Sequence, residues 1–159
     1  MLIAVVSDTH KVSNYIQIAK EHIKEADILI HLGDNAEDVK ELTEGFIGKV
    51  YAVKGNCDLS HKYPEEQIIE IDDKRIFITH GDLYNVKLNM QRLYYKAKEI
   101  DADIALFGHT HKELLLEEEG IFFMNPGSIS LPRNGGRYIG YIKIEADQKP
   151  NIYLKEIKN

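Results

Sequence analysis

Apolar residues in the first third of the chain form short runs that alternate with amphipathic segments. The runs at residues 2–6, 28–32 and 50–53 are rich in β-branched side chains, which is typical of strands buried on both faces. Between these runs, apolar residues recur every three or four positions at 13–26 and 36–43, which predicts two helices. This order predicts parallel strands joined by right-handed crossovers, with helices on the faces of the sheet.

The remainder of the chain contains more predicted strands, and most of them form hairpins. Helix-type spacing returns at 90–100, directly before a predicted strand at 104–107. The predicted hairpins join residues 68–71 to 75–79, 114–116 to 121–124, and 138–144 to 152–157. Asn125-Pro126-Gly127-Ser128 is predicted to be a turn. The chain, 1–159, is expected to be a single α/β domain with helices outside, and the pattern predicts no strand order.

Composition limits the classes of protein to which the chain can belong. Hydrophobic residues make up 43% and charged residues 29%, as in ordinary globular proteins. The net charge of −6 argues against an extended nucleic-acid surface, which would need clustered Lys and Arg. The single cysteine, Cys57, excludes an internal disulfide framework and fits a reducing compartment. The longest apolar run, residues 1–6, is far too short for a membrane span, so a cytoplasmic protein is expected.

Residue types that ligate metals follow five of the strand-like runs. In an open α/β sheet, ligands bind at the carboxyl ends of the strands. Of the residues listed next, the first four in chain order, from Asp8 to Asn56, follow predicted parallel strands and so lie at such ends. The residues are Asp8, His10, Asp34, Asn56, His80, His109 and His111.

These side chains offer carboxylate oxygen, amide oxygen and imidazole nitrogen, a mixture that suits manganese, iron or zinc. Seven ligands exceed the needs of one metal ion. Two cations about 3.5–4 Å apart, bridged by a carboxylate and a hydroxide, would hold both the attacking and the leaving oxygen during displacement at phosphorus. Such bound cations can attract a phosphate to an otherwise acidic protein. The pattern therefore indicates a hydrolase.

Simpler interpretations of the same residues stay open from the sequence alone. Asp8 and Asp34 could each be a helix N-cap after a strand, although this leaves the histidines unexplained. His31 lies within an apolar strand and is interpreted as a core residue rather than a ligand. His61 is either a solvated loop residue or a group on the substrate side.

Five ordered motifs resemble those of the calcineurin-like metallophosphoesterases. They are Asp8-Thr9-His10, Gly33-Asp34, Gly55-Asn56-Cys57-Asp58, His80-Gly81 and Gly108-His109-Thr110-His111. The chain is most similar to the small single-domain prokaryotic phosphodiesterases of that superfamily. The resemblance implies an αββα sandwich of two mixed β-sheets flanked by helices.

The resemblance also implies roles for these residues. Asp8, His10, Asp34 and His111 would hold the first metal, Asp34 would bridge, and Asn56, His80 and His109 would complete the second. Asp34, Asn56 and His80 are the expected catalytic residues, and a bridging hydroxide would be the nucleophile. Two divalent ions are the expected cofactors, with manganese first and nickel, iron, zinc and cobalt as alternatives.

Two positions depart from the pattern of this family. Many relatives carry a histidine, credited with aiding departure of the leaving group, where this chain has Cys57. Relatives also often carry a histidine at the position of Asp82. Cys57, Asp58, His61 and Asp82 are therefore the candidates for the substrate side of the pocket.

The resulting prediction is a metal-dependent phosphodiesterase that acts on a small phosphodiester, with no membrane partner and with homo-oligomerisation left open. A phosphomonoesterase of the same fold is one alternative. A protein-interaction scaffold that retains the fold is the other, and the retromer subunit that resembles this superfamily is an example. Such a scaffold is free to lose ligand residues, whereas all seven ligand types are present here.

Overall fold

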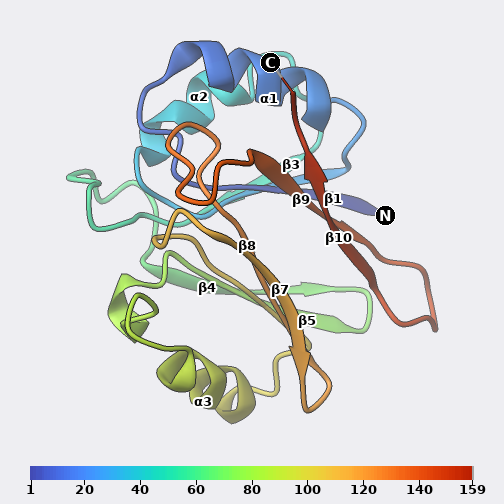
Figure 1. Ribbon diagram of the computed structural model, residues 1–159. Helices are drawn as coiled ribbons and strands as arrows, with labels where there is room; N and C mark the ends of the chain where they lie inside the picture. Colours follow the sequence, from blue (N-terminus) through green and yellow to red (C-terminus); the bar gives the residue numbers. More distant parts are fainter. Residues whose placement is uncertain (159) are drawn as a thin grey trace.

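Two five-stranded sheets pack face to face in the computed structural model, which describes residues 1–158 (Figure 1). The first sheet has the order β10-β9-β1-β2-β3, and the second has the order β4-β5-β6-β8-β7. The first contains β1 (Leu2–Val6), β2 (Ile28–His31), β3 (Lys49–Ala52), β9 (Tyr138–Lys143) and β10 (Asn151–Glu156). The second contains β4 (Glu66–Ile71), β5 (Lys74–Thr79), β6 (Ile104–Leu106), β7 (Glu113–Glu118) and β8 (Ile121–Pro126).

Helices cover the outer face of each sheet (Figure 1). The helices α1 (Ser13–Ile23) and α2 (Val39–Leu42) lie over the first sheet, and α3 (Gln91–Glu99) lies over the second. Two short 3₁₀ helices, η1 (Ala36–Asp38) and η2 (Asp82–Tyr84), follow β2 and β5. The layers are therefore helix, sheet, sheet, helix, and the predicted αββα sandwich is confirmed.

Both sheets are mixed. Parallel pairing joins β1 to β2 and β2 to β3 in the first sheet, and β5 to β6 and β6 to β8 in the second. Antiparallel pairing adds the hairpins β9-β10, β4-β5 and β7-β8, together with the pair β1-β9. The parallel strands β1, β2 and β3 end at one edge of their sheet, so the loops that follow them lie together.

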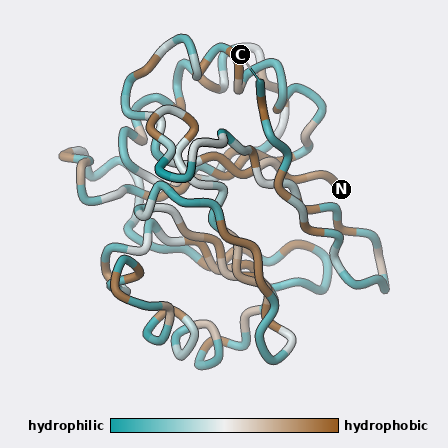
Figure 2. Tube along the Cα trace, in the orientation of Figure 1, coloured by the Kyte–Doolittle hydropathy of each residue, from teal (hydrophilic) through white to brown (hydrophobic). Residues whose placement is uncertain are grey.

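The buried strands separate three apolar layers. Along β1, Ile3 and Val5 belong to the core between the sheets, whereas Ala4 and Val6 pack with residues of α1 such as Ile16. This alternation follows from the two-residue period of a strand. On the far side, Phe77 and other residues of the second sheet pack with α3. Figure 2 shows the hydrophobic strands in the middle and the hydrophilic turns outside.

Three predicted boundaries differ from the structure. The segment 36–43 is a 3₁₀ helix followed by a single α-helical turn rather than a continuous helix. The first helix ends at Ile23, so Ala26 packs beyond it in a turn. Asn125 and Pro126 belong to the end of β8, and only from Gly127, with φ 76°, does the chain turn. Asn125 and Pro126 stay in the strand because they pair with β7.

Within residues 1–158, no helix combines the length and the apolar character needed to cross a membrane.

Candidate metal centre

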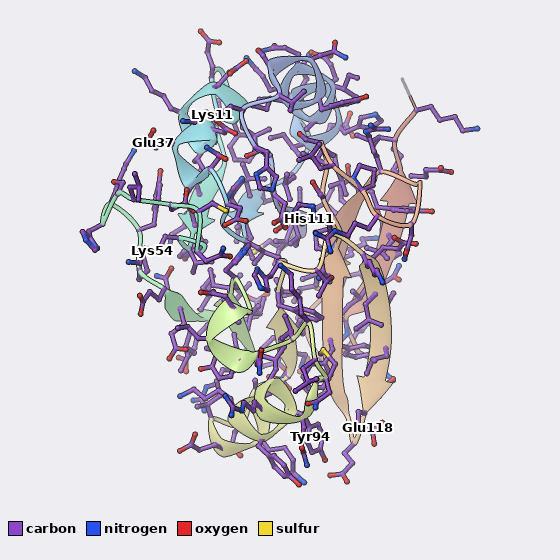
Figure 3. All side chains as sticks on the ribbon, turned by 60° about the vertical axis from the view of Figure 1, so that its left-hand side comes forward. Lys11, Glu37, Lys54, Tyr94, His111 and Glu118 are labelled. Carbon is purple, nitrogen blue, oxygen red and sulfur yellow. The ribbon has the colours of Figure 1, made fainter. Side chains whose placement is uncertain are left out.

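The predicted ligands come from loops at one edge of each sheet, and backbone hydrogen bonds join these loops. In the first sheet, the Asp8 amide donates to the Gly33 carbonyl at 3.1 Å. In the second, the Gly108 amide donates to the His80 carbonyl at 2.9 Å. The His109 amide lies 3.3 Å from Asp8 Oδ2, so the two sheets meet at the candidate site. In Figure 3, the labelled His111 lies in the middle of this face.

Five of the predicted ligands have a left-handed backbone, which non-glycine residues rarely adopt. The φ angles are 55° for Asp8, 46° for His10, 58° for Asp34, 65° for His109 and 58° for His111. A left-handed conformation costs conformational free energy in a residue other than glycine. Such strained residues cluster at functional sites, where a particular side-chain direction is required. The left-handed backbone therefore indicates a functional role for these loops, independently of their residue types.

Two glycines allow other loops to approach the carboxylates. A Cβ at Gly55 would lie 2.2 Å from Asp34 Oδ1, and a Cβ at Gly108 would lie 2.1 Å from Ser7 Oγ and 2.7 Å from Asp8 Oδ2. Any larger residue would push these loops away from the acids. The glycines in the two predicted motifs are thus explained by close approach.

The first group of ligand atoms converges from three loops. One ligand atom each from Asp8, His10, Asp34 and His111 lies within 4.8 Å of all the others. His111 Nε2 is 3.1 Å from Asp8 Oδ1 and 3.1 Å from His10 Nε2, and His10 Nε2 is 3.9 Å from Asp34 Oδ2. The resemblance implied these four residues as ligands of one metal, and the structure places them together.

The second group lies on the other side of Asp34. His80 Nε2 is 3.3 Å from Asp34 Oδ1, and His109 Nδ1 is 3.2 Å from His80 Nε2. Asp34 therefore presents one carboxylate oxygen to each group, as a bridging ligand would.

Hydrogen bonds to the backbone orient two of the imidazoles. His80 Nδ1 lies 2.8 Å from the Leu32 carbonyl, and His111 Nδ1 lies 3.0 Å from the Leu131 carbonyl. Since a carbonyl only accepts, each Nδ1 donates, and Nε2 is the ring nitrogen that faces the site. Ligating histidines are commonly oriented in this way.

The residues fit a bound cation. Asp8 is fully buried, and its Oδ1 has no hydrogen-bond partner among the described residues. A buried carboxylate oxygen left unpaired is costly, and a cation beside it would remove that cost. The Nε2 atoms of His80 and His111 lie beside the carboxylates of Asp34 and Asp8. Carboxylate and imidazole together suit a divalent transition metal.

The charges in the site shift several pKa values. Burial raises the pKa of Asp34, but hydrogen bonds from His80 and from the Cys57 amide outweigh burial and hold it well below its usual range. Burial lowers the pKa of His80, yet the Asp34 hydrogen bond and the Asp8 charge raise it overall. Burial and the charge of His80 lower the pKa of His109. Asp34 is therefore ionised, as a bridging ligand must be.

Asn56 is the predicted ligand that the structure does not bring into either group. Its side chain is exposed, and its amide nitrogen lies 3.7 Å from Cys57 Sγ. The adjacent Cys57 amide donates to Asp34 Oδ1 at 3.0 Å, so the loop that carries Asn56 lies against the site. Ligation by Asn56 stays a prediction.

The four substrate-side candidates differ in their surroundings. Asp58 accepts backbone hydrogen bonds from Asp34 at 3.0 Å, Ala36 at 2.8 Å and Gly55 at 2.7 Å, so its carboxylate joins two loops. Its role on the substrate side stays a prediction.

The other three candidates are at least partly exposed. Cys57 is exposed as a residue, but partial desolvation of its thiol, together with the charges of Asp34 and Asp58, raises the pKa of the thiol to about 11. His61 is exposed in its loop, with Nδ1 3.3 Å from Lys54 Nζ. Asp82 is half-buried at the start of η2.

The N-cap interpretation of Asp8 and Asp34 is wrong. The N-cap of α1 is Val12 and that of η1 is Asn35, and neither helix has a side-chain cap. His31 is a core residue as predicted: it is fully buried, its Nδ1 accepts from the Gly33 amide at 3.2 Å, and its Nε2 lies 3.2 Å from Thr9 Oγ1.

Several supporting residues could not be identified from the sequence. Ser7 Oγ donates to Asp8 Oδ2 at 2.5 Å, and Ser128 Oγ donates to the Asp8 carbonyl at 2.7 Å. Asn125 Nδ2 donates to the Gly108 carbonyl at 2.8 Å. The sequence shows that Ser7 adjoins Asp8 and that Ser128 adjoins the turn at Gly127. It does not show which residues their hydroxyl groups contact, because the two partners of such a contact lie as many as 120 residues apart in the chain.

Comparison with known proteins identifies the class. The family model of the calcineurin-like phosphoesterase superfamily domain matches residues 1–149, and the chain belongs to this superfamily. A probable metallophosphoesterase of Bacillus subtilis, YsnB, is 36% identical over 137 residues, which are 84% of this chain and 78% of that protein.

Solved structures show the same fold. A predicted phosphoesterase of Streptococcus pneumoniae has a TM-score of 0.78 at 29% identity and covers 97% of both chains. A structure described as a novel archaeal phosphodiesterase has a TM-score of 0.78 at 25% identity, with 98% of this chain and 100% of that chain covered. Vps29 from Entamoeba histolytica, solved in complex with Zn²⁺, shares the fold at 19% identity, a TM-score of 0.77 and coverage of 98% and 99%.

Proposed function

We propose that this chain is a phosphodiesterase that uses two divalent metal ions, with manganese as the first candidate. The observation that carries the proposal is the division of Asp34 between two ligand groups, with Oδ2 toward His10 and Oδ1 toward His80. The unpaired Asp8 Oδ1 supports it, because that buried oxygen needs a cation.

The chain's own residues would perform defined tasks. Asp8, His10, Asp34 and His111 would hold one ion, and Asp34, His80, His109 and Asn56 would hold the other. When bound, two such cations neutralise the charge of a phosphate and lower the pKa of the attacking water. The hydrogen bonds from His80 to Leu32 and from His111 to Leu131 keep both rings oriented before substrate arrives.

The preference for diesters rests on Cys57. An alkyl monoester has a poor leaving group that benefits from a proton donor, and a positioned acid typically contributes about 10²–10⁴-fold. A thiol whose pKa is raised to about 11 is a weak acid at neutral pH. Diesters with a stable leaving group need this help less. The likeness to an archaeal phosphodiesterase supports the same choice.

A pair of substrates tests the proposal. Bis(4-nitrophenyl) phosphate should be hydrolysed with a higher kcat/KM than an alkyl phosphate monoester, in the presence of Mn²⁺. Cys57→His places a group of reference pKa near 6.5 at this position, and the ratio of monoester to diester kcat/KM should rise by roughly 10-fold or more. Metal content is measured in both proteins. A wild type that prefers the monoester would refute the diesterase assignment.

The scaffold alternative predicts a different result. A protein-interaction scaffold needs neither converging ligands nor strained loops, yet both are present at this site. Absence of hydrolysis for every ester at full metal occupancy would favour the scaffold.

A further inference from the structure

A groove of about 430 Å³ lies beside the candidate metal centre. Its apolar lining consists of Val86, Met90, Phe107 and Leu114. These residues come from the loop before α3, from the position directly after β6 and from β7. Its volume falls within the range of small-molecule sites, about 300–1,000 Å³.

The groove shares its walls with the segments that carry the predicted ligands. Thr110, which lies between His109 and His111 in the chain, lines the groove. The Arg133 amide donates to the His111 carbonyl at 2.9 Å, and Arg133 also lines it. A diester with its phosphorus among the ligands would therefore extend one ester group past Thr110 into this groove.

Cations surround this apolar lining. Lys87, Lys112 and Arg133 line the groove, with Glu113 as the one acid there. None of the three cations forms an ion pair with residues 1–158, in contrast to cations such as Lys20 and Lys149. Three cations beside one acid make this lining locally positive, although the chain has a net charge of −6. The surplus of positive charge is complementary to an anionic ligand.

We propose that this groove binds the half of the substrate beyond the reacting phosphate, and that this half carries an apolar ring and a second anionic group, as a nucleotide does. The apolar lining accounts for the ring, which the half-buried Met90 and Leu114 can contact. The three cations account for the second anion. This inference rests on the proposed phosphodiesterase function and specifies its substrate class.

Three diesters with one leaving group test the substrate class. They are methyl 4-nitrophenyl phosphate, thymidine 5′-(4-nitrophenyl phosphate), and the same thymidine compound with a 3′-phosphate. We expect kcat/KM to rise at each step, since the second compound adds the ring and the third adds the anion. Equal kcat/KM for all three would overturn the proposal while leaving the phosphodiesterase function intact.

Variants test which residues of the groove produce the increase in kcat/KM from the thymidine ring and which produce the increase from the 3′-phosphate. Lys87→Ala combined with Arg133→Ala should reduce the gain from the 3′-phosphate by roughly 10-fold, because each exposed pair contributes up to about 1 kcal/mol. Leu114→Asp should reduce the gain from thymidine. Lys155→Ala is the matched control, since Lys155 is exposed on β10 and forms no ion pair with residues 1–158.

Direct binding decides the proposal even if no diester is hydrolysed. Thymidine 3′,5′-bisphosphate is titrated calorimetrically into the purified protein and into protein treated with chelator. The expected result is binding that survives chelation and weakens roughly 10-fold in the Lys87 and Arg133 double variant but not in Lys155→Ala. Binding that disappears with the metal, or that ignores the double variant, would show that the groove is not the site.

Discussion

Both ends of the sandwich carry acidic residues, but the two ends place them in different surroundings. At the end that carries the predicted ligands, Asp8 is fully buried and Asp34 is 3% exposed. At the opposite end, where the hairpins turn on the right of Figure 1, Asp73 is exposed and pairs with Lys74 at 2.6 Å. An exposed ion pair of this kind contributes little, whereas the buried Oδ1 of Asp8, which has no hydrogen-bond partner among the described residues, is costly unless a cation lies beside it.

The backbone shows the same contrast. Left-handed residues occur at both ends, but at the hairpin end Asp72, Glu119 and Asp147 occupy turns that require such angles. At the ligand end, the left-handed Asp8 and Asp34 direct their carboxylates toward histidines. Burial, an unpaired oxygen and strain outside a simple turn therefore distinguish the candidate metal centre from the hairpin end, and acidity alone does not.

Removal of metal should have the largest effect of these experiments, and the effect should be confined to the end that carries the predicted ligands. Chelation is expected to reduce hydrolysis by about 10³-fold or more, because the charge that stabilises the reacting phosphate is lost. The fold should persist, since the three apolar layers contain no ligand. Far-ultraviolet circular dichroism with and without chelator checks the fold, and re-added Mn²⁺ should restore activity. Wholesale unfolding would show that the ligand end also holds the structure together.

A pair of glycine variants compares the ends by packing. Gly108→Ala places a methyl group 2.1 Å from Ser7 Oγ, so we expect roughly a 100-fold loss of kcat/KM as the ligand loops shift. Gly120→Ala at the hairpin end meets nothing within 4 Å and has only the strain of φ 81°. Its cost is about 1 kcal/mol of stability with activity retained.

Urea unfolding measures the stability of both variants, and enzyme kinetics measure their kcat/KM. Equal kinetic losses in Gly108→Ala and Gly120→Ala would mean that close approach at Gly108 does not position the ligands.

The buried His31 should make stability depend on pH. Burial lowers its pKa from 6.5 to about 4, so the unfolded chain binds more protons than the folded chain between these values. Stability therefore falls as pH decreases through this window, by about 2 kcal/mol between pH 7 and pH 5. His31→Gln should flatten this part of the dependence, measured by urea unfolding in chelator. An identical slope in wild type, His31→Gln and His31→Asn would contradict the assignment.

The fold was largely predictable because it depends on local apolar patterns. The runs that became β1, β2 and β5 are nearly continuous and β-branched, and a buried strand needs little else. The short segment at 36–43 was harder, since a single helical turn has too few residues for periodicity to distinguish it from a 3₁₀ helix. Strand order depends on pairings far apart in the chain, such as Val5 with Gly140, which no local pattern contains.

The candidate site was predictable where residue type and motif were enough, as for Asp8, Asp34 and His111. Asp58 shows the limit. Its place beside Asn56 and Cys57 suggested a substrate-side group, but its three backbone hydrogen bonds depend on how the loops at 34–36 and 55–58 come together. The direction of a side chain within a strained loop cannot be read from its neighbours in sequence.

Counting bound metal in Asp34→Asn is the most direct test of whether Asp34 bridges two metal sites. Asp34 presents an oxygen to each ligand group, so loss of its charge should weaken both sites, and the variant should lose two-metal occupancy rather than only turn over more slowly. Wild type and Asp73→Asn, an exposed acid from the hairpin end, are measured beside it by elemental analysis after dialysis. We expect two ions per chain in wild type and in Asp73→Asn, and fewer than two in Asp34→Asn. Two tightly bound ions in Asp34→Asn would contradict the bridging role of Asp34.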